Sequence, residues 1–117
     1  NGFGFDDGRD KFIQLMKQYP DLSAIFCVSD EMAIGAISAA YRLGIKIPED
    51  VSIMGYDNLK ISEMSVPPLT TTAQPLVKMA EKATEILFKI INKKADDVHS
   101  IIMPYQIIER ESVKNIK

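Results

Sequence analysis

The sequence has few of the residues from which catalytic and metal sites are built. It contains one cysteine, Cys27, and one histidine, His99, in 117 residues. A single cysteine excludes a disulfide within the chain and is consistent with a reducing compartment. A zinc site or a hydrolytic triad needs more partners than a lone histidine provides. We therefore expect no enzymatic activity, no metal and no cofactor.

Long apolar runs and an excess of positive charge are also missing. No run approaches the ~18 apolar residues of a membrane span, so we expect no membrane partner. The formal net charge is -2 and the pI is about 5.4, so the chain lacks the basic surface that holds a phosphate backbone. The start, Asn1 to Phe5, has neither an initiator methionine nor a signal peptide, which predicts a segment of a longer cytoplasmic protein.

Glycines and acidic residues near the start do not form a known binding motif. Gly2, Gly4 and Gly8 have the wrong spacing for a dinucleotide-binding loop, and no strand precedes them, so we interpret them as turn glycines. Asp6 and Asp7 could form a metal pair. Because they are adjacent and have no further ligand at a suitable spacing, a solvated helix cap is the simpler interpretation.

A strand, helix, strand unit organises the chain. Short apolar runs rich in β-formers lie at 24–28 and 51–56, as expected of strands covered on both faces. Between them a helix is predicted over 31–43. Because a hairpin cannot contain a helix of this length, the two strands are predicted to be parallel. The predicted fold class is α/β, with a mostly parallel sheet flanked by helices.

Turn and cap residues set the other boundaries. The helix over 31–43 has Ser29 or Asp30 as its N-cap, and Gly44 is its left-handed stop. The remaining predicted elements are a helix over 8–18 capped by Asp7, a short helix over 58–64, a strand over 69–73, a long helix over 76–92 with Pro75 in its first turn, a polar connection over 93–98, two extended pieces within 99–109, and a frayed tail over 112–117.

Polar side chains follow both predicted parallel strands. Ser29 ends the first strand and Asp57 ends the second. In open α/β sheets, ligands bind outside the carboxyl ends of the strands. An ionised Asp accepts from two hydroxyls or ring N–H groups, and a Ser both donates and accepts, which suits a neutral polyhydroxylated ligand. The alternative is that each side chain only caps the helix or turn that follows it.

Three segments of the chain carry a family resemblance. They lie at 24–36 with 47–58, at 67–75, and at 107–112. Together they resemble the LacI/GalR family of bacterial transcription regulators, in the effector-binding region that is built like periplasmic sugar-binding proteins. Their order and spacing match along the whole chain. The resemblance implies that the helix-turn-helix headpiece, the hinge helix and the first half of the effector-binding region lie outside this sequence.

The resemblance implies an incomplete periplasmic-binding-protein-like (type I) fold. Residues 1–70 and 103–112 would belong to the C-terminal subdomain, and helix 76–92 to the N-terminal one. The intact protein would be a homodimeric repressor or activator that contacts operator DNA only through the missing headpiece. A small effector, often a sugar or a purine, would set its DNA affinity. Phe3 resembles an aromatic that stacks on the effector ring, and the alternative is a core phenylalanine.

A dimer surface is also expected. The helix over 31–43 is apolar over a wider arc than one sheet face needs, and its outer flank resembles the family's pairing helix. The predicted two-fold contact residues are Ile34, Ser38, Tyr41, Met64 and Ser65. The alternative is a helix covered by its own chain. The apolar stripe of helix 76–92, which includes Leu76, Ala83 and Leu87, is predicted to fold back onto this chain or to dock against another copy.

Two rival functions come from other classes. A sugar-binding protein of an ABC importer would share the fold but would be exported and monomeric. The Leu-Thr-Thr-x-x-Gln-Pro pattern at 69–75 and the Ile-Glu-Arg-Glu-Ser close at 108–112 favour the regulator. A nucleotide-dependent α/β enzyme would need a phosphate-binding loop, which the sequence lacks.

Overall fold

The computed structural model describes residues 2–92 and 100–116. The predicted connection over 93–98 and His99 lie outside these residues. The chain divides into two compact units, Asn1–Ala73 with Ile107–Lys117, and Gln74–Gln106. Assignment of these parts to two subdomains of a larger region stays a prediction. Within the described ranges, no helix is both long and apolar enough to cross a membrane.

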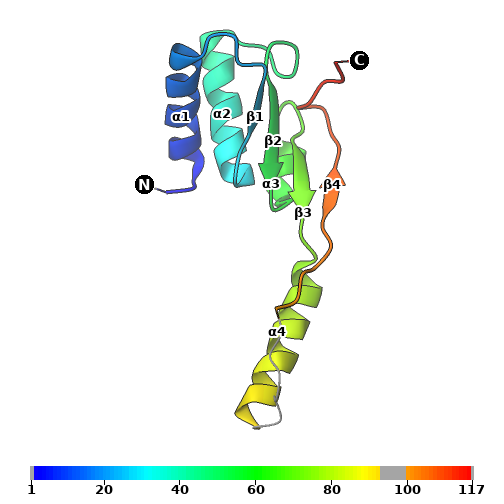
Figure 1. The fold of residues 1–117 in the computed structure, drawn as a ribbon. Coiled ribbons are helices and arrows are strands. Elements are labelled where there is room, and N and C mark those ends of the chain that lie inside the picture. Colours follow the sequence, from blue (N-terminus) through cyan, green and yellow to red (C-terminus); the bar gives the residue numbers. More distant parts are fainter. Residues whose placement is uncertain (1, 93–99, 117) are drawn as a thin grey trace. The chain divides into compact units, whose positions relative to one another are not determined.

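Helices and strands alternate through the first unit, and the second contains one long helix. The elements are α1 (Phe5–Gln18), β1 (Ala24–Phe26), α2 (Asp30–Leu43), β2 (Ser52–Tyr56), α3 (Lys60–Met64), β3 (Thr70–Ala73), α4 (Leu76–Ile91) and β4 (Gln106–Ile108) (Figure 1). The predicted elements all exist except one of the two extended pieces near the end, since β4 is the one strand among residues 100–116.

One four-stranded sheet has the order β1-β2-β3-β4. β1 pairs with β2 in parallel, with Phe26 opposite Met54. β2 pairs with β3 in parallel, with Met54 opposite Thr70. The prediction of an α/β fold with a mostly parallel sheet is therefore confirmed. The parallel pairing brings the carboxyl ends of β1, β2 and β3 to one edge of the sheet.

Helix α2 connects the first two strands and begins at a well-defined cap. The Ser29 hydroxyl oxygen accepts from the Met32 N–H at 3.2 Å, so Ser29 is the N-cap and Asp30 is already helical. Gly44 ends the helix at φ 72°, in the left-handed region that glycine adopts without strain. This result decides between the two predicted N-caps.

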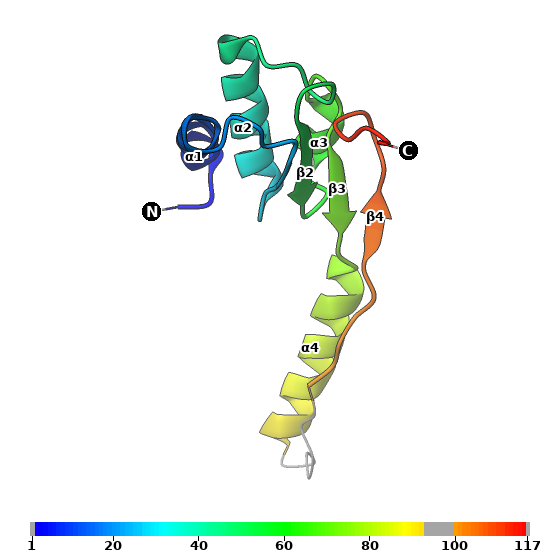
Figure 2. The same ribbon diagram turned by 45° about the horizontal axis from the view of Figure 1, so that its top comes forward.

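The core lies between α2, α1 and the sheet. Helix α2 packs against both β2 and α1 (Figure 2). Its buried alanines, including Ala33 and Ala36, meet Phe12 of α1 and Ile53 of β2. Small side chains on α2 let it lie close to both neighbours, which is how a helix between two layers keeps native packing density.

The α1–α2 crossing depends on two glycines. A Cβ on Gly8 would lie 2.0 Å from the Met32 carbonyl oxygen, and a Cβ on Gly35 would lie 2.0 Å from the Phe5 carbonyl oxygen. The interpretation of Gly8 as a turn glycine is therefore wrong, because it lies inside α1. Its role is to let two helix backbones approach closely.

Helix α1 begins three residues earlier than predicted. Its N-cap is Gly4, without a side-chain cap hydrogen bond. Asp7 does not cap the helix. Its carboxylate accepts instead from the Gly2 N–H at 3.2 Å. Asp7 lies in the first turn of α1, where an acidic residue is favourable as well as at the N-cap, so residue preference alone does not separate the two positions.

Ser112 corrects the prediction of a frayed tail. It is fully buried, donates to the Ile53 carbonyl at 2.6 Å and accepts from the Thr70 N–H at 2.8 Å. The Ile53 N–H in turn donates to the Ser112 carbonyl at 2.8 Å. The segment around Ser112 therefore connects β2 to the start of β3. Pattern reasoning missed this because one short polar residue carries no periodic signal.

The second unit contains α4 and the chain up to Gln106. Met79, Ala83 and Ile86 share a pocket of about 180 Å³ with Ile101 and Met103, so the returning chain covers part of the apolar stripe. Leu76 and Leu87 remain 54% and 55% exposed. The expectation that the stripe folds back onto this chain is therefore wrong at these two positions, and Ala83, the third residue of the predicted stripe, is exposed as well. Docking against another copy stays a prediction. Pro75 is the N-cap of α4 rather than a residue of its first turn.

Candidate effector site at the carboxyl edge of the sheet

Two predicted site residues leave the sheet at the same edge. Phe26 of β1 pairs with Met54 of β2. Ser29 comes three residues after Phe26, and Asp57 comes three residues after Met54. Because the strands are parallel, both residues emerge where ligands of open α/β sheets bind. The sequence therefore placed both residues at the correct edge. Whether they contact an effector stays a prediction.

Ser29 caps α2 and also holds Phe3. Its hydroxyl donates to the Phe3 carbonyl oxygen at 2.7 Å while it accepts from the Met32 N–H. Ser29 therefore caps α2, and whether it also contacts an effector stays a prediction. The hydroxyl hydrogen is already committed, so toward a ligand the Ser29 oxygen can serve only as an acceptor.

Phe3 lies beside Ser29 and outside the core. Its side chain is 73% exposed, so the interpretation as a core phenylalanine is wrong in this structure. The contact from Ser29 brings these two predicted site residues together at the carboxyl edge. An exposed aromatic ring at this edge offers a flat apolar surface for the face of a ring-shaped ligand.

Asp57 has an unusual backbone conformation. Its φ is 109° and that of Asn58 is 53°. Asn tolerates the left-handed region, but a φ of 109° lies outside it and costs about 1 to 3 kcal/mol for a non-glycine residue. The Asp57 N–H donates to the Thr72 carbonyl of β3 at 2.9 Å. The N-cap of α3 is Leu59, whose side chain makes no cap hydrogen bond.

Asp30 lies beneath this loop and was not predicted as a site residue. It is fully buried. One carboxylate oxygen accepts from the Leu59 N–H at 2.7 Å, and the other accepts from the Thr71 hydroxyl at 2.5 Å. Burial raises the pKa of Asp30 above its ordinary value, and Asp57 raises it further, while the bonds from Thr71 and Leu59 and the charge of Arg110 oppose the shift.

Arg110 is the second residue that sequence reasoning missed. Its guanidinium donates to the Asn58 side-chain oxygen at 2.9 Å, to the Leu69 carbonyl at 2.7 Å and to the Ser62 hydroxyl at 3.0 Å. Arg110 thereby connects Asn58, in the loop after β2, to Ser62 of α3 and to Leu69 at the start of β3. The only sequence signal for it was its place in the Ile-Glu-Arg-Glu-Ser segment, because a single arginine near the end of a chain has no periodic context.

The predicted dimer residues differ in exposure. Tyr41 is 86% exposed and Met64 is exposed as well. Ile34 is half-buried and packs against the core. Ser38 is half-buried, and the half-buried Ser65 donates to the Ser62 and Pro67 carbonyls. The residues with the largest surface for a partner are thus Tyr41 and Met64.

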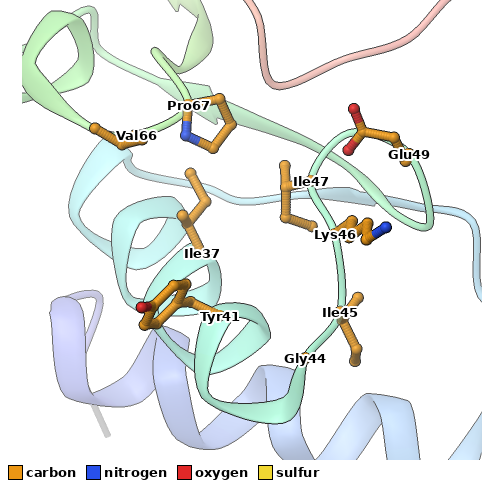
Figure 3. Close-up of a pocket in the computed structure, with 9 residues that line it drawn as sticks. All are labelled: Ile37, Tyr41, Gly44, Ile45, Lys46, Ile47, Glu49, Val66 and Pro67. Atoms are coloured by element: carbon orange, nitrogen blue, oxygen red, sulfur yellow. The ribbon is translucent and has the colours of Figure 1, made fainter.

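A groove lies next to Tyr41. Its volume is about 350 Å³. Ile37 and Tyr41 of α2 form one side, the loop over 44–49 forms the other, and Val66 and Pro67 close one end (Figure 3). Val66 is 87% exposed at the groove's rim. Phe3, Ser29 and Asp57 do not line this groove.

A metal centre has no candidate in the part of the chain that the structure describes. No cluster of three or more His, Cys, Asp or Glu side chains is arranged to hold an ion there. Burial raises the pKa of the Cys27 thiol to about 11, so Cys27 is an inert core residue at neutral pH.

Comparison with known proteins identifies the family. Residues 4–113 match the periplasmic binding protein-like domain family. The chain belongs to this family. The resemblance to LacI/GalR regulators is confirmed as well, because the relatives of this periplasmic binding protein-like chain are transcription regulators of that type.

Three relatives illustrate the likeness. The HTH-type transcriptional regulator MalR of Clostridium butyricum is 42% identical over 103 residues, which are 88% of this chain and 30% of that protein. The structure of the transcriptional regulator CelR in complex with cellobiose has a TM-score of 0.91 at 28% identity and covers 96% of this chain and 34% of its own. A LacI family regulator from Enterococcus faecium with bound ribose has a TM-score of 0.84 at 29% identity over 98% of this chain and 42% of its own.

Proposed function

We propose that this chain is part of the effector-sensing module of a bacterial transcription regulator. It binds a small neutral molecule, a sugar in the first place, at the carboxyl edge of its sheet, and pairs with a second copy. The chain spans 30% of the length of the curated relative MalR, so DNA binding belongs to other parts of the protein. The module has no enzymatic role and works in the cytoplasm.

The observation that carries the proposal is the arrangement of Phe3, Ser29 and Asp57. An aromatic face, a hydroxyl oxygen and a carboxylate follow one another along one edge of a parallel sheet. An apolar ring face with a few polar acceptors is the combination that sugar pockets use. The strained backbone at Asp57 supports the same view, since strain that the surroundings maintain is concentrated at functional sites.

A sugar is favoured over a purine by the relatives with bound ligands. CelR was solved with cellobiose and the Enterococcus faecium regulator with ribose. Both ligands are neutral and carry many hydroxyls. A carboxylate such as that of Asp57 accepts from two neighbouring hydroxyls, and each such charge-assisted bond is stronger than a neutral one. A purine base, which offers ring N–H donors, is the second ligand class.

Pairing with a second copy is supported by the surface around Tyr41. Tyr41, Met64 and Val66 are large apolar side chains that are mostly exposed in one chain. Tyr and Met are enriched at protein interfaces, and a groove beside them gives a partner side chain a place to insert. We propose that this surface forms a two-fold contact.

The deciding experiment separates the regulator from an exported sugar-binding protein. Fluorescence anisotropy would measure binding of the full-length gene product to DNA from upstream of its own gene, with and without cellobiose, ribose or the purine base adenine. The regulator is expected to bind this DNA with an affinity that one of the three molecules changes about fivefold or more. Binding of a sugar by a protein without affinity for the DNA would instead identify a transport component.

A further inference from the structure

The loop Asp57–Leu59 is held in a conformation that it would not adopt alone. Asp57 and Asn58 both have positive φ and neither is glycine. Such a conformation persists only where the surrounding contacts determine it. Three consecutive backbone N–H groups are fixed: Asp57 donates to the Thr72 carbonyl, Asn58 to the Thr71 hydroxyl oxygen at 3.3 Å, and Leu59 to the Asp30 carboxylate.

Asp30 is at the centre of these contacts. Its two carboxylate oxygens accept from the Leu59 N–H at 2.7 Å and from the Thr71 hydroxyl at 2.5 Å. The same Thr71 oxygen accepts from the Asn58 N–H. The carboxylate therefore acts on two loop residues, one directly and one through the orientation that it imposes on the Thr71 hydroxyl. Within the described residues, no other side chain accepts from both the Leu59 N–H and the Thr71 hydroxyl.

The sheet is built to admit this carboxylate. A Cβ on Gly55 would lie 2.3 Å from one Asp30 oxygen, so the absence of a side chain at Gly55 provides the space. Burying an ionisable group without an opposite charge in direct contact opposes folding. An apolar residue of similar volume would be the more stabilising choice. The need to fill the space beside Gly55 therefore does not explain why residue 30 is a carboxylate.

We propose that Asp30 is a positioning residue of the effector site, which fixes the loop Asp57–Leu59 so that the Asp57 side chain is presented at the carboxyl edge. This inference rests on the proposed function, because it gives the loop its purpose. Asp30 itself touches no effector. It lies beneath the loop with no exposed surface, whereas Asp57 is partly exposed.

The first test measures the loop without any ligand. Hydrogen exchange followed by mass spectrometry on the full-length gene product would report peptides covering 56–62. Asp30→Asn is expected to speed exchange there about tenfold or more, because one acceptor of the carboxylate becomes an amide donor. The control is Asp50→Asn, since Asp50 also accepts a backbone N–H, from Lys46 at 2.8 Å, but in a different loop.

A second variant covers the case in which Asp30→Asn does not fold. Thr71→Val removes the hydroxyl that links Asp30 to Asn58 and keeps the shape of the side chain. It is expected to speed exchange in the same peptide and to leave peptides from β1 unchanged. Unchanged exchange at 56–62 in both variants would overturn the proposal. Equal acceleration throughout the first unit would also overturn it, because Asp30 would then be a general structural residue.

The second test separates this proposal from the proposed function. Cellobiose and ribose would be titrated into Asp30→Asn, Asp57→Asn and the double variant. If Asp30 acts through Asp57, Asp30→Asn alone weakens sugar binding. In a protein that already carries Asp57→Asn, the same substitution weakens binding further by less than about twofold. Additive losses would overturn the positioning role. An unchanged affinity in Asp57→Asn would instead count against the proposed function, while the exchange measurements would still decide whether Asp30 holds the loop.

Discussion

At the scale of single residues, the carboxylates of this chain have different roles that their sequence context does not reveal. Asp30 and Asp57 each follow a strand; the sequence predicts Asp30 as a possible helix cap, and Asp57 as either a cap or an effector ligand. The structure buries Asp30 completely and leaves Asp57 partly exposed in a strained loop. The difference arises because Gly55 and Thr71, which are distant in sequence, provide the space and the hydrogen bond that Asp30 needs.

The raised pKa of Asp30 predicts a pH dependence of stability. Below the ordinary value of 3.8 the carboxyl is protonated in both the folded and unfolded chain. As the pH rises, the unfolded chain loses its proton first, so the folded state loses stability until the pH passes the raised pKa. The wild type is therefore expected to lose stability relative to Asp30→Asn as the pH rises above the ordinary pKa of 3.8. Urea unfolding of both proteins measures this difference.

A difference that grew in favour of the wild type with rising pH would contradict this prediction. The groups that face Asp30 are Asp57, which raises its pKa, and Arg110, which lowers it. Both groups are also present in the variant, so the comparison between the two proteins isolates the contribution of Asp30.

The sequence was sufficient for residues whose role depends on local position. Ser29 and Asp57 were correctly placed at strand ends because strands and their parallel pairing follow from local pattern and connection length. Asp30, Arg110 and Ser112 were missed. Each makes its decisive contacts with residues more than about 25 positions away, and no local pattern contains that information.

Among the helices, cap residues predicted the ends of α2 well and the start of α1 poorly. Helix α2 ends where Gly44 predicted, and it begins at Asp30 because Ser29 provides the cap. Helix α1 was placed three residues too late because a good cap residue, Asp7, lies inside its first turn. Acidic residues are favourable both as caps and in the first turn, so residue type alone could not separate the two positions.

The crossing of α1 and α2 gives a prediction about helix packing. Gly35→Ala would place a Cβ 2.0 Å from the Phe5 carbonyl oxygen and 2.9 Å from the Arg9 nitrogen. Because both contacts are with backbone, the helices must separate, and we expect a loss of at least about 1 to 3 kcal/mol in the free energy of unfolding. This loss exceeds the roughly 1 kcal/mol that alanine gains over glycine in a helix. Denaturant unfolding measures it.

Gly4→Ala is the matched control for this substitution. A Cβ on Gly4 would meet only the Glu31 carboxylate at 3.8 Å, which is ordinary contact. The expected loss is under about 1 kcal/mol, from the weaker N-cap alone. Equal stability of Gly35→Ala and the wild type would show that the two helices do not meet as closely as the structure places them.

At the scale of the whole molecule, the main question is what the exposed apolar surface does. Tyr41 and Val66 line the groove on the first unit, where Met64 is also exposed. Leu76 and Leu87 are exposed on α4 of the second unit. The sequence predicted an apolar flank of α2 that a partner covers; Tyr41 on that flank is exposed, and the partner stays a prediction. It could not distinguish Ile34, which packs on the core, from Tyr41, which does not, because both lie on the same flank of one helix.

The structure makes Tyr41 the better residue for testing the dimer. Tyr41→Glu is expected to weaken self-association of the full-length gene product by about 2 kcal/mol or more, roughly thirtyfold, because it places a charge at the centre of an apolar contact. Sedimentation velocity across a concentration series measures this. The control is Tyr19→Glu, which makes the same change at another exposed tyrosine, outside the groove. A Tyr41→Glu protein as dimeric as the control would rule out this surface.

A calorimetric titration of Asp57 variants tests the proposed effector site most directly. Cellobiose, ribose and adenine would be titrated into the full-length gene product as the wild type, as Asp57→Asn and as Asp50→Asn. Asparagine has nearly the same size and shape as aspartate, so the variant is expected to keep the loop conformation and to lose the charged acceptor.

We expect one of the three molecules to bind the wild type and the Asp50→Asn protein with equal affinity. Asp57→Asn should weaken that binding by about 1.5 to 3 kcal/mol, or roughly tenfold to over a hundredfold, with little change in melting temperature. Unchanged affinity in Asp57→Asn together with a lowered melting temperature would contradict the account, because Asp57 would then support the fold and not the effector.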